Sequence, residues 1–198
     1  MIIVDVVQGT PEWFTARCGI PTASNFDKII TVDGKPSKQR QKYLYQLAGE
    51  RVAGAKAWTY VNEAMQRGVE LEAEARQLFE MVTGEEVTQV GMCMPSEKSW
   101  ACSPDGLIGK DSGLEIKCPL IHTHVEYLLE SSLPSDYFQQ VQGNMMITGR
   151  ASWNFMSYYP GLRPLILVVK RDDKFCMALL DELAKFTKEL WTISEKIA

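Results

Sequence analysis

Two acidic residues and a lysine stand close together near the middle of the chain. Asp105 lies in a Pro-Asp-Gly turn, and ten residues later Glu115 and Lys117 flank Ile116 in a strand-like segment. Side chains two residues apart on a strand share a face, so Glu115 and Lys117 point the same way and Ile116 points into the core. Two carboxylates can hold Mg²⁺ through oxygen atoms, and a lysine can orient or deprotonate the water that the ion activates. The pattern indicates metal-dependent hydrolysis of a phosphodiester.

The turn between the two segments decides whether the acids can meet. A hairpin centred between Asp111 and Ser112 places Asp105 opposite Cys118, about 10 Å from Glu115 at ~3.3 Å per residue. We therefore expect the strands to slip or bulge so that both acids reach one ion. Taken alone, each piece also has an ordinary explanation, since Asp-Gly pairs are common in turns and an acid and a lysine on one strand face are often simply solvated.

Hydrophobic periodicity places these residues in a mixed α/β chain. Helical spacing predicts helices over 22–30, 37–51, 61–82, 121–130, 134–148 and 179–197, with Asn62 capping the long one and Thr83-Gly84 ending it. Alternating patterns predict strands over 2–7, 86–94, 100–102, 107–109, 114–118, 152–158 and 165–170. Helices on both sides of a central run of strands are typical of an α/β or α+β fold with a mixed sheet, here in one domain over residues 1–198.

Composition and charge exclude several classes of protein. Hydrophobic residues make up 45% and charged residues 23%, which is ordinary globular usage. No apolar run reaches the ~18–20 residues of a membrane span, and the N-terminus lacks the basic region of a secretory signal, so we expect a cytoplasmic protein. The five scattered cysteines fit neither zinc or iron–sulfur sites nor a disulfide framework. A net charge of −4 argues against whole-surface binding to nucleic acid but allows a local basic groove.

Several ordered motifs carry a family resemblance. With Pro104, the acids and lysine match the PD-(D/E)xK nuclease signature, and residues 101–107 and 113–119 together resemble the phage lambda exonuclease and YqaJ-type viral recombinase family. Further matching pieces occur in the same order: Trp13, Arg17, Gly19 and Thr22-Ala23-Ser24, then Gly68, Glu72, Ala75-Arg76 and Leu78-Phe79-Glu80, and lastly Gln140-Val141-Gln142. They span residues 8–185. The resemblance implies a restriction-endonuclease-like core, a central mixed β-sheet flanked by helices.

The resemblance also implies which residues bind metal and act in catalysis. The metal ligands would be Asp105, Glu115, the main-chain carbonyl of Ile116 and, completing a second metal position, Glu72. Lys117 would position or activate the water, and Gln140 matches a glutamine of the family's active site. Two Mg²⁺ ions per site are implied, with Mn²⁺ as a substitute.

A second group of residues matches the family's pocket for a terminal 5′-phosphate. Arg17 and Ser24 occupy the matching positions, and a guanidinium with a hydroxyl near a helix N-terminus suits phosphate oxygens. The family's third basic residue lies in the following loop, which is shorter here at 31–36. Lys35 is our candidate for it, with Lys38 or Arg40 as alternatives.

The resemblance thus implies a Mg²⁺-dependent exonuclease that removes mononucleotides from the 5′-ended strand of linear double-stranded DNA. It would leave 3′ overhangs for single-strand-annealing recombination. A ring-shaped homotrimer, a single-strand annealing protein as partner, and a phage or prophage origin in a bacterial cytoplasm are also implied. Two alternatives stay open: a restriction-type or RecB-like endonuclease with the same core, and a DNA-end-binding module without catalysis. The intact Asp105, Glu115 and Lys117 argue against the last.

Overall fold

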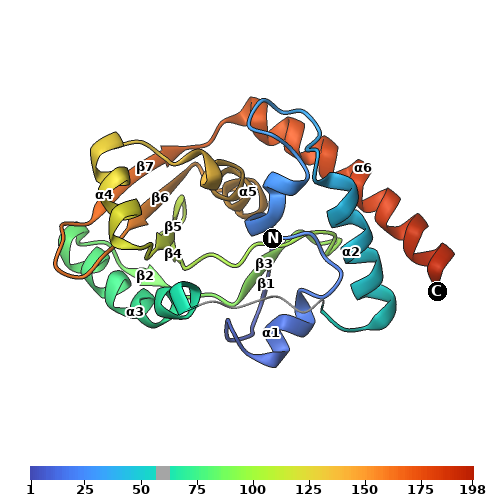
Figure 1. Cartoon of the computed structure of the whole chain (residues 1–198), viewed down its shortest axis with the longest axis horizontal. Coiled ribbons are helices and arrows are strands. Elements are labelled where there is room, and N and C mark those ends of the chain that lie inside the picture. Colours follow the sequence, from blue (N-terminus) through green and yellow to red (C-terminus); the bar gives the residue numbers. More distant parts are fainter. Residues whose placement is uncertain (57–62) are drawn as a thin grey trace.

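A five-stranded mixed sheet forms the centre of the computed structural model, which describes residues 1–56 and 63–198 (Figure 1). Its strand order is β2-β4-β5-β6-β7. β5 and β6 are parallel, and the other neighbouring pairs are antiparallel. The strands are β2 (Val87–Thr88), β4 (Gly106–Ile108), β5 (Ser112–Lys117), β6 (Ser152–Ser157) and β7 (Leu165–Lys170). The predicted mixed sheet with flanking helices is confirmed.

Helices cover both faces of this sheet. On one face Ala75 and Phe79 of α3 (Glu63–Thr83) pack against Leu114 and Ile116 of β5. On the other face α5 (Phe138–Thr148) packs Val141 and Met145 against strand residues Leu107, Trp153 and Phe155. The parallel pair needs a crossover connection, and α5 together with α4 (Ile121–Glu130) and η2 (Ser135–Tyr137) supplies it.

A third layer covers the far side of α5 and completes the largest core cluster. It consists of the 3₁₀ helix η1 (Ala23–Lys28), α2 (Arg40–Ala53) and the long α6 (Asp173–Ile197). A small second sheet pairs β1 (Ile2–Val4) with β3 (Met92–Met94), and α1 (Pro11–Ala16) follows β1. Within the described residues, no helix is long and apolar enough to cross a membrane.

The structure corrects several predicted boundaries. The strand predicted over 86–94 divides into β2 and β3, which belong to different sheets. The chain passes close to the N-terminal segment at Gly91, where an added Cβ would lie 2.0 Å from the Val6 carbonyl oxygen. Residues 100–102 form only isolated bridges, residues 22–30 give a 3₁₀ helix, and α1 was not predicted. Capping by Asp172 starts α6 six residues before the predicted 179. α4 and β7 match their predicted bounds, whereas the start at 61 and the Asn62 cap lie outside the described residues.

Close packing of η1 on α5 depends on a glycine. A Cβ on Gly143 would lie 2.5 Å from Cδ2 of Phe26, a side chain with no exposed surface. We expect Gly143→Ala to lower the free energy of unfolding by about 1–3 kcal/mol, since an overpacked core must shift. Denaturant titration would measure the change. Gly49→Ala, where a Cβ meets nothing within 4 Å, is the matched control on helix α2. Equal stability of the two variants would contradict this account.

Candidate active site

The hairpin from β4 to β5 brings the two acids together without a slip or a bulge. The observed pairs are Gly106 with Leu114 and Ile108 with Ser112, so the hairpin is centred on Lys110. Asp105 therefore lies next to Glu115 across the strand pair, one position beyond the ladder. The predicted register, with Asp105 opposite Cys118, is wrong because the loop that closes the hairpin is only Gly109 to Asp111.

Asp105 is fixed directly before the first residue of β4. Its Oδ2 accepts a hydrogen bond from the main-chain N–H of Ile116 at 2.5 Å. That N–H lies on the edge of β5 that β4 no longer covers, so the carboxylate takes the place of a strand partner. Burial, together with the charges of Glu115 and Glu72, raises the pKa of Asp105 well above its usual range. Asp105 is thus a poorly solvated carboxylate with the negative charge of Glu115 beside it.

Glu115 is almost completely buried, and three side chains bind its carboxylate. Its Oε1 accepts hydrogen bonds from Lys117 Nζ at 2.6 Å and from Gln140 Nε2 at 2.6 Å. Its Oε2 accepts one from Asn144 Nδ2 at 3.0 Å. Gln140 and Asn144 lie one turn apart on α5, so this helix supplies one donor to each oxygen. The predicted shared face of Glu115 and Lys117 is confirmed, with Ile116 in the core on the α3 side.

Glu72 approaches the hairpin from α3. Its Oε1 accepts a hydrogen bond from Arg76 at 2.5 Å, and Arg76 Nε donates to the main-chain oxygen of Asp105 at 3.2 Å. Burial raises the pKa of Glu72; Arg76 opposes this effect and the charge of Glu115 adds to it. Arg76 thereby ties the helix acid to the turn that carries Asp105.

The residues at this edge fit a divalent cation. Asp105 and Glu115 are neighbouring carboxylates in a poorly solvated place, and a cation would relieve their repulsion. The Lys117 carbonyl accepts from Tyr158 N–H and points to β6, so the Ile116 carbonyl points to the opposite edge, toward Asp105. All are oxygen donors of the kind Mg²⁺ takes. Within residues 1–56 and 63–198, no three His, Cys, Asp or Glu side chains already form a cluster that could hold a metal.

Arg17 and Ser24, predicted to bind a phosphate, are in direct contact. One terminal nitrogen of Arg17 donates to Thr22 Oγ1 and to Ser24 Oγ, each at 3.2 Å. The guanidinium stacks 3.9 Å from the ring centroid of Trp13, whose Nε1 donates to Ser103 Oγ at 2.9 Å. Arg17 Nε is buried without a partner within the described part of the chain. Ser103 lies two residues before Asp105, so the Trp13–Ser103 hydrogen bond links this cluster to the edge of the sheet that carries Asp105 and Glu115.

Two lysines that the sequence did not single out are linked to this cluster. Lys28 Nζ donates to the Asn25 side chain at 2.6 Å, and that side chain bonds in turn to Ser24. Burial, and next the charge of Arg17, lowers the pKa of Lys56. Lys56 Nζ also lies 5.9 Å from the ring centroid of Trp13, on which Arg17 stacks, so the two cations border one place that suits an anion.

The loop residues proposed for the third basic position are placed differently. Lys35 and Lys38 are exposed, and neither side chain has a recorded bond to Arg17 or Ser24. Arg40 is engaged elsewhere, since its two terminal nitrogens donate to the two carboxylate oxygens of Glu189, each at 2.8 Å. Lys35 remains a prediction, with Lys28 and Lys56 as structural competitors.

Two further residues at the carboxylate edge were missed from the sequence as parts of the site. Asn144 follows Gln140 by four residues, which puts both on one side of a helix, and Arg76 follows Glu72 by the same interval. These four-residue intervals were the only indication of Asn144 and Arg76 in the sequence. Such intervals are common in helices, so they identify neither residue unless the side of each helix that faces the sheet is known.

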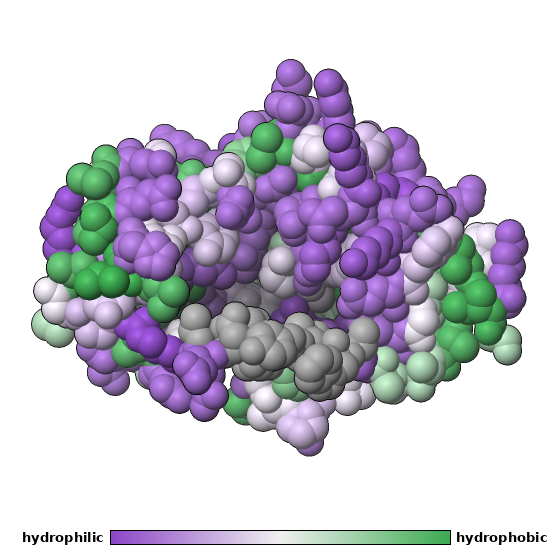
Figure 2. Space-filling view, viewed as in Figure 1, coloured by the Kyte–Doolittle hydropathy of each residue, from purple (hydrophilic) through white to green (hydrophobic). Residues whose placement is uncertain are grey.

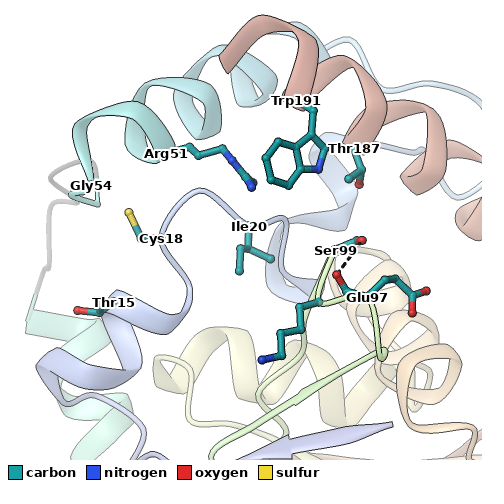
Figure 3. A pocket seen from close by; sticks show the side chains of 10 residues that line it. Thr15, Cys18, Ile20, Arg51, Gly54, Glu97, Ser99, Thr187 and Trp191 are labelled. Atoms are coloured by element: carbon teal, nitrogen blue, oxygen red, sulfur yellow. Dashed lines mark hydrogen bonds between the residues drawn. The ribbon is translucent and has the colours of Figure 1, made fainter. Parts of the chain in front are cut away.

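A separate pocket of about 340 Å³ opens between α2, α6 and the 97–99 turn (Figure 3). Arg51 stacks there over Trp191, 3.3 Å from its ring centroid. None of the carboxylates at the β4–β5 edge lines it, so we assign it no part in the site. Its lining residues are Thr15, Cys18, Ile20, Arg51, Gly54, Glu97, Lys98, Ser99, Thr187 and Trp191.

The mixed sheet with flanking helices is the fold also found in solved exonuclease structures. The profile of the YqaJ-like viral recombinase domain matches residues 12–151. The chain therefore belongs to this family, and the resemblance noted from its motifs is confirmed.

Solved structures agree with this assignment. An alkaline exonuclease (LHK-Exo) from Laribacter hongkongensis is 36% identical, with a TM-score of 0.86, and the match covers 95% of this chain and 96% of that one. The same similarity holds for LHK-Exo in complex with dAMP. A phage-related exonuclease from Haemophilus somnus 129PT shares the fold at a TM-score of 0.73 and 16% identity, covering 90% of this chain and 96% of that one. No curated protein sequence matches the chain.

Proposed function

We propose that the protein is a Mg²⁺-dependent exonuclease that degrades the 5′-ended strand of linear double-stranded DNA. The observation that carries the proposal is the edge where Asp105, Glu115 and Lys117 meet, next to the cationic cluster around Arg17. Family membership and the similarity to an alkaline exonuclease support the nuclease activity. The enzyme would release mononucleotides, and digestion in the 5′ to 3′ direction would leave a 3′ overhang.

Each residue has a role in this proposal. Asp105, Glu115 and the Ile116 carbonyl would hold the ion, and Glu72 would complete a second ion position. The ion, when bound, activates water and neutralises charge on the phosphate. The Lys117 ammonium orients the water, and Gln140 keeps Glu115 in place.

The direction of digestion would be set by the residues around Arg17, which we call the Arg17 cluster: Arg17, Thr22, Ser24 and Trp13. Arg17, Ser24 and a lysine would bind the terminal 5′-phosphate, so that the first phosphodiester reaches Asp105. Contacts of this kind go to the backbone and not to bases, which makes recognition independent of sequence.

Assembly belongs to the same proposal. A homotrimeric ring around the DNA would keep the enzyme on its substrate, and a single-strand annealing protein would take the exposed strand, inside a bacterial host cell. Apolar side chains gather over α4, at the left of Figure 2, where Ile121, Val125 and Leu129 are exposed at four-residue intervals. A surface of this kind suits subunit contacts. Sedimentation at several concentrations would report a species of three chain masses; a monomer throughout would contradict the ring.

A digestion experiment tests the activity and its direction. A linear duplex labelled at one 5′ or one 3′ end would be incubated with Mg²⁺ or with EDTA, beside a closed circle and a 5′-hydroxyl duplex. We expect Mg²⁺-dependent release of labelled 5′ mononucleotide, faster from phosphorylated ends, and an intact circle. Cutting of the circle would favour the endonuclease alternative. Binding of ends without any cutting would favour the end-binding module.

A further inference from the structure

Asn144 occupies a position that is unfavourable for an asparagine. It lies inside α5 with 1% of its surface exposed, in a helix enclosed between the sheet and the third layer. Asparagine is a weak helix former, and a buried amide is costly unless it is hydrogen-bonded. The bond that its amide nitrogen makes is to Glu115 Oε2. The partner of this amide is therefore a carboxylate that the proposed function assigns to the ion.

The three bonds to Glu115 are unevenly distributed. Lys117 and Gln140 both donate to Oε1, which fills the two lone pairs of that oxygen. Oε2 receives the single bond from Asn144. The acceptor position left over is thus the second lone pair of Oε2, and Asn144 sets its direction by holding that oxygen.

We propose that Asn144 is a positioning residue, which holds the Glu115 carboxylate so that Oε2 faces the ion. The proposal rests on the function proposed above, since it gives Glu115 an ion to bind. Residues that hold a metal ligand by hydrogen bonds typically contribute about 10–100-fold to metal affinity or activity. Because the asparagine amide is neutral, its removal changes the placement of Glu115 without changing the charge of the site.

Ion binding without DNA gives a readout that does not depend on turnover. The full chain would be titrated with Mn²⁺, and the free ion followed by electron paramagnetic resonance. We expect Asn144→Leu, which has a similar size and no donor, to weaken Mn²⁺ binding about 10-fold or more. Asn144→Gln keeps the amide donor on a longer side chain, and its Mn²⁺ affinity is expected to lie between those of Asn144→Leu and the wild type. Binding of DNA ends in EDTA is expected to stay within twofold of wild type.

Gln139→Leu is the matched control. Gln139 is a buried amide on the same helix, 6% exposed, but it donates to the main-chain oxygen of Ile30 at 3.2 Å and, within the described part of the chain, makes no hydrogen bond to a carboxylate. We expect its Mn²⁺ binding to equal that of wild type. A similar loss in both variants would show that only the packing of α5 matters and would overturn the proposal.

The remaining outcomes also decide the question. Wild-type Mn²⁺ binding by a folded Asn144→Leu protein would overturn the role of Asn144 and leave the nuclease proposal standing. If the leucine variant does not fold by circular dichroism, Asn144→Ala, which also lacks the donor, replaces it under the same criterion. A wild-type protein that binds no Mn²⁺ and cleaves no DNA would overturn both proposals together.

Discussion

Lys117→Met is expected to reduce cleavage of duplex DNA by about 10²–10³-fold, the range for loss of one positioned hydrogen-bond donor in an active site. The variant should still bind DNA ends in EDTA, because Arg17 and its neighbours are untouched. Lys117 Nζ lies 2.6 Å from Glu115 Oε1 and 4.9 Å from the ring centroid of Tyr137, so its position is set by both. Single-turnover digestion of an end-labelled duplex measures the rate, and fluorescence anisotropy measures binding.

The protonation state of Lys117 specifies its role. Burial alone would lower the pKa of Lys117, but the charges of Glu115 and Asp105 raise it above its usual range. These two carboxylates favour the ammonium form, which donates hydrogen bonds and can orient water. The sequence left open whether the lysine orients or deprotonates the water, and the site as it stands favours orientation.

The control for Lys117→Met concerns stability. Glu115 has 2% of its side chain exposed, and removing one partner of a buried ion pair costs about 3–5 kcal/mol. Adding Glu115→Gln removes the unpaired charge, so the double variant should regain stability in denaturant titration while remaining inactive. Wild-type cleavage by a folded Lys117→Met protein would show that Lys117 is structural. Lost end binding in the folded single variant would also contradict its assignment.

Arg17→Ala is expected to remove the preference for 5′-phosphorylated over 5′-hydroxyl ends. A hydrogen bond to a charged group contributes about 1.5–3 kcal/mol, which corresponds to a loss of about 10–150-fold on phosphorylated ends. The hydroxyl substrate should change little, because it offers no terminal phosphate to bind. The ratio of the two initial rates, measured on duplexes of the same sequence, reports the effect.

The controls for Arg17→Ala also identify the third cation. Arg171→Ala removes an arginine that pairs with Asp173 on the surface, and it should leave the ratio unchanged. Lys28→Ala and Lys56→Ala are expected to lower the ratio more than Lys35→Ala, because Lys28 is linked to Ser24 through Asn25 and Lys56 lies near the Trp13 ring. An unchanged ratio in Arg17→Ala would mean that the phosphate is bound elsewhere.

Local patterns were sufficient for much of the fold. The bounds of α4 and β7 follow from side-chain periodicity and breakers, and so does the shared face of Glu115 and Lys117. Boundaries failed where tertiary contacts override local preference. Residues 86–94 alternate like one strand, but the approach to β1 at Gly91 divides them between two sheets.

By itself, the sequence determined the chemistry of the site: two carboxylates, a lysine on the same strand face, and ordered motifs that identify the family. The tertiary structure decided how these groups meet. The three-residue loop at Gly109 to Asp111 set the register that brings Asp105 beside Glu115. The packing of α3 and α5 on opposite faces decided that Arg76 binds the Asp105 carbonyl and that Asn144 binds Glu115. A four-residue interval on a helix fixes which residues are neighbours, but only packing fixes what they face.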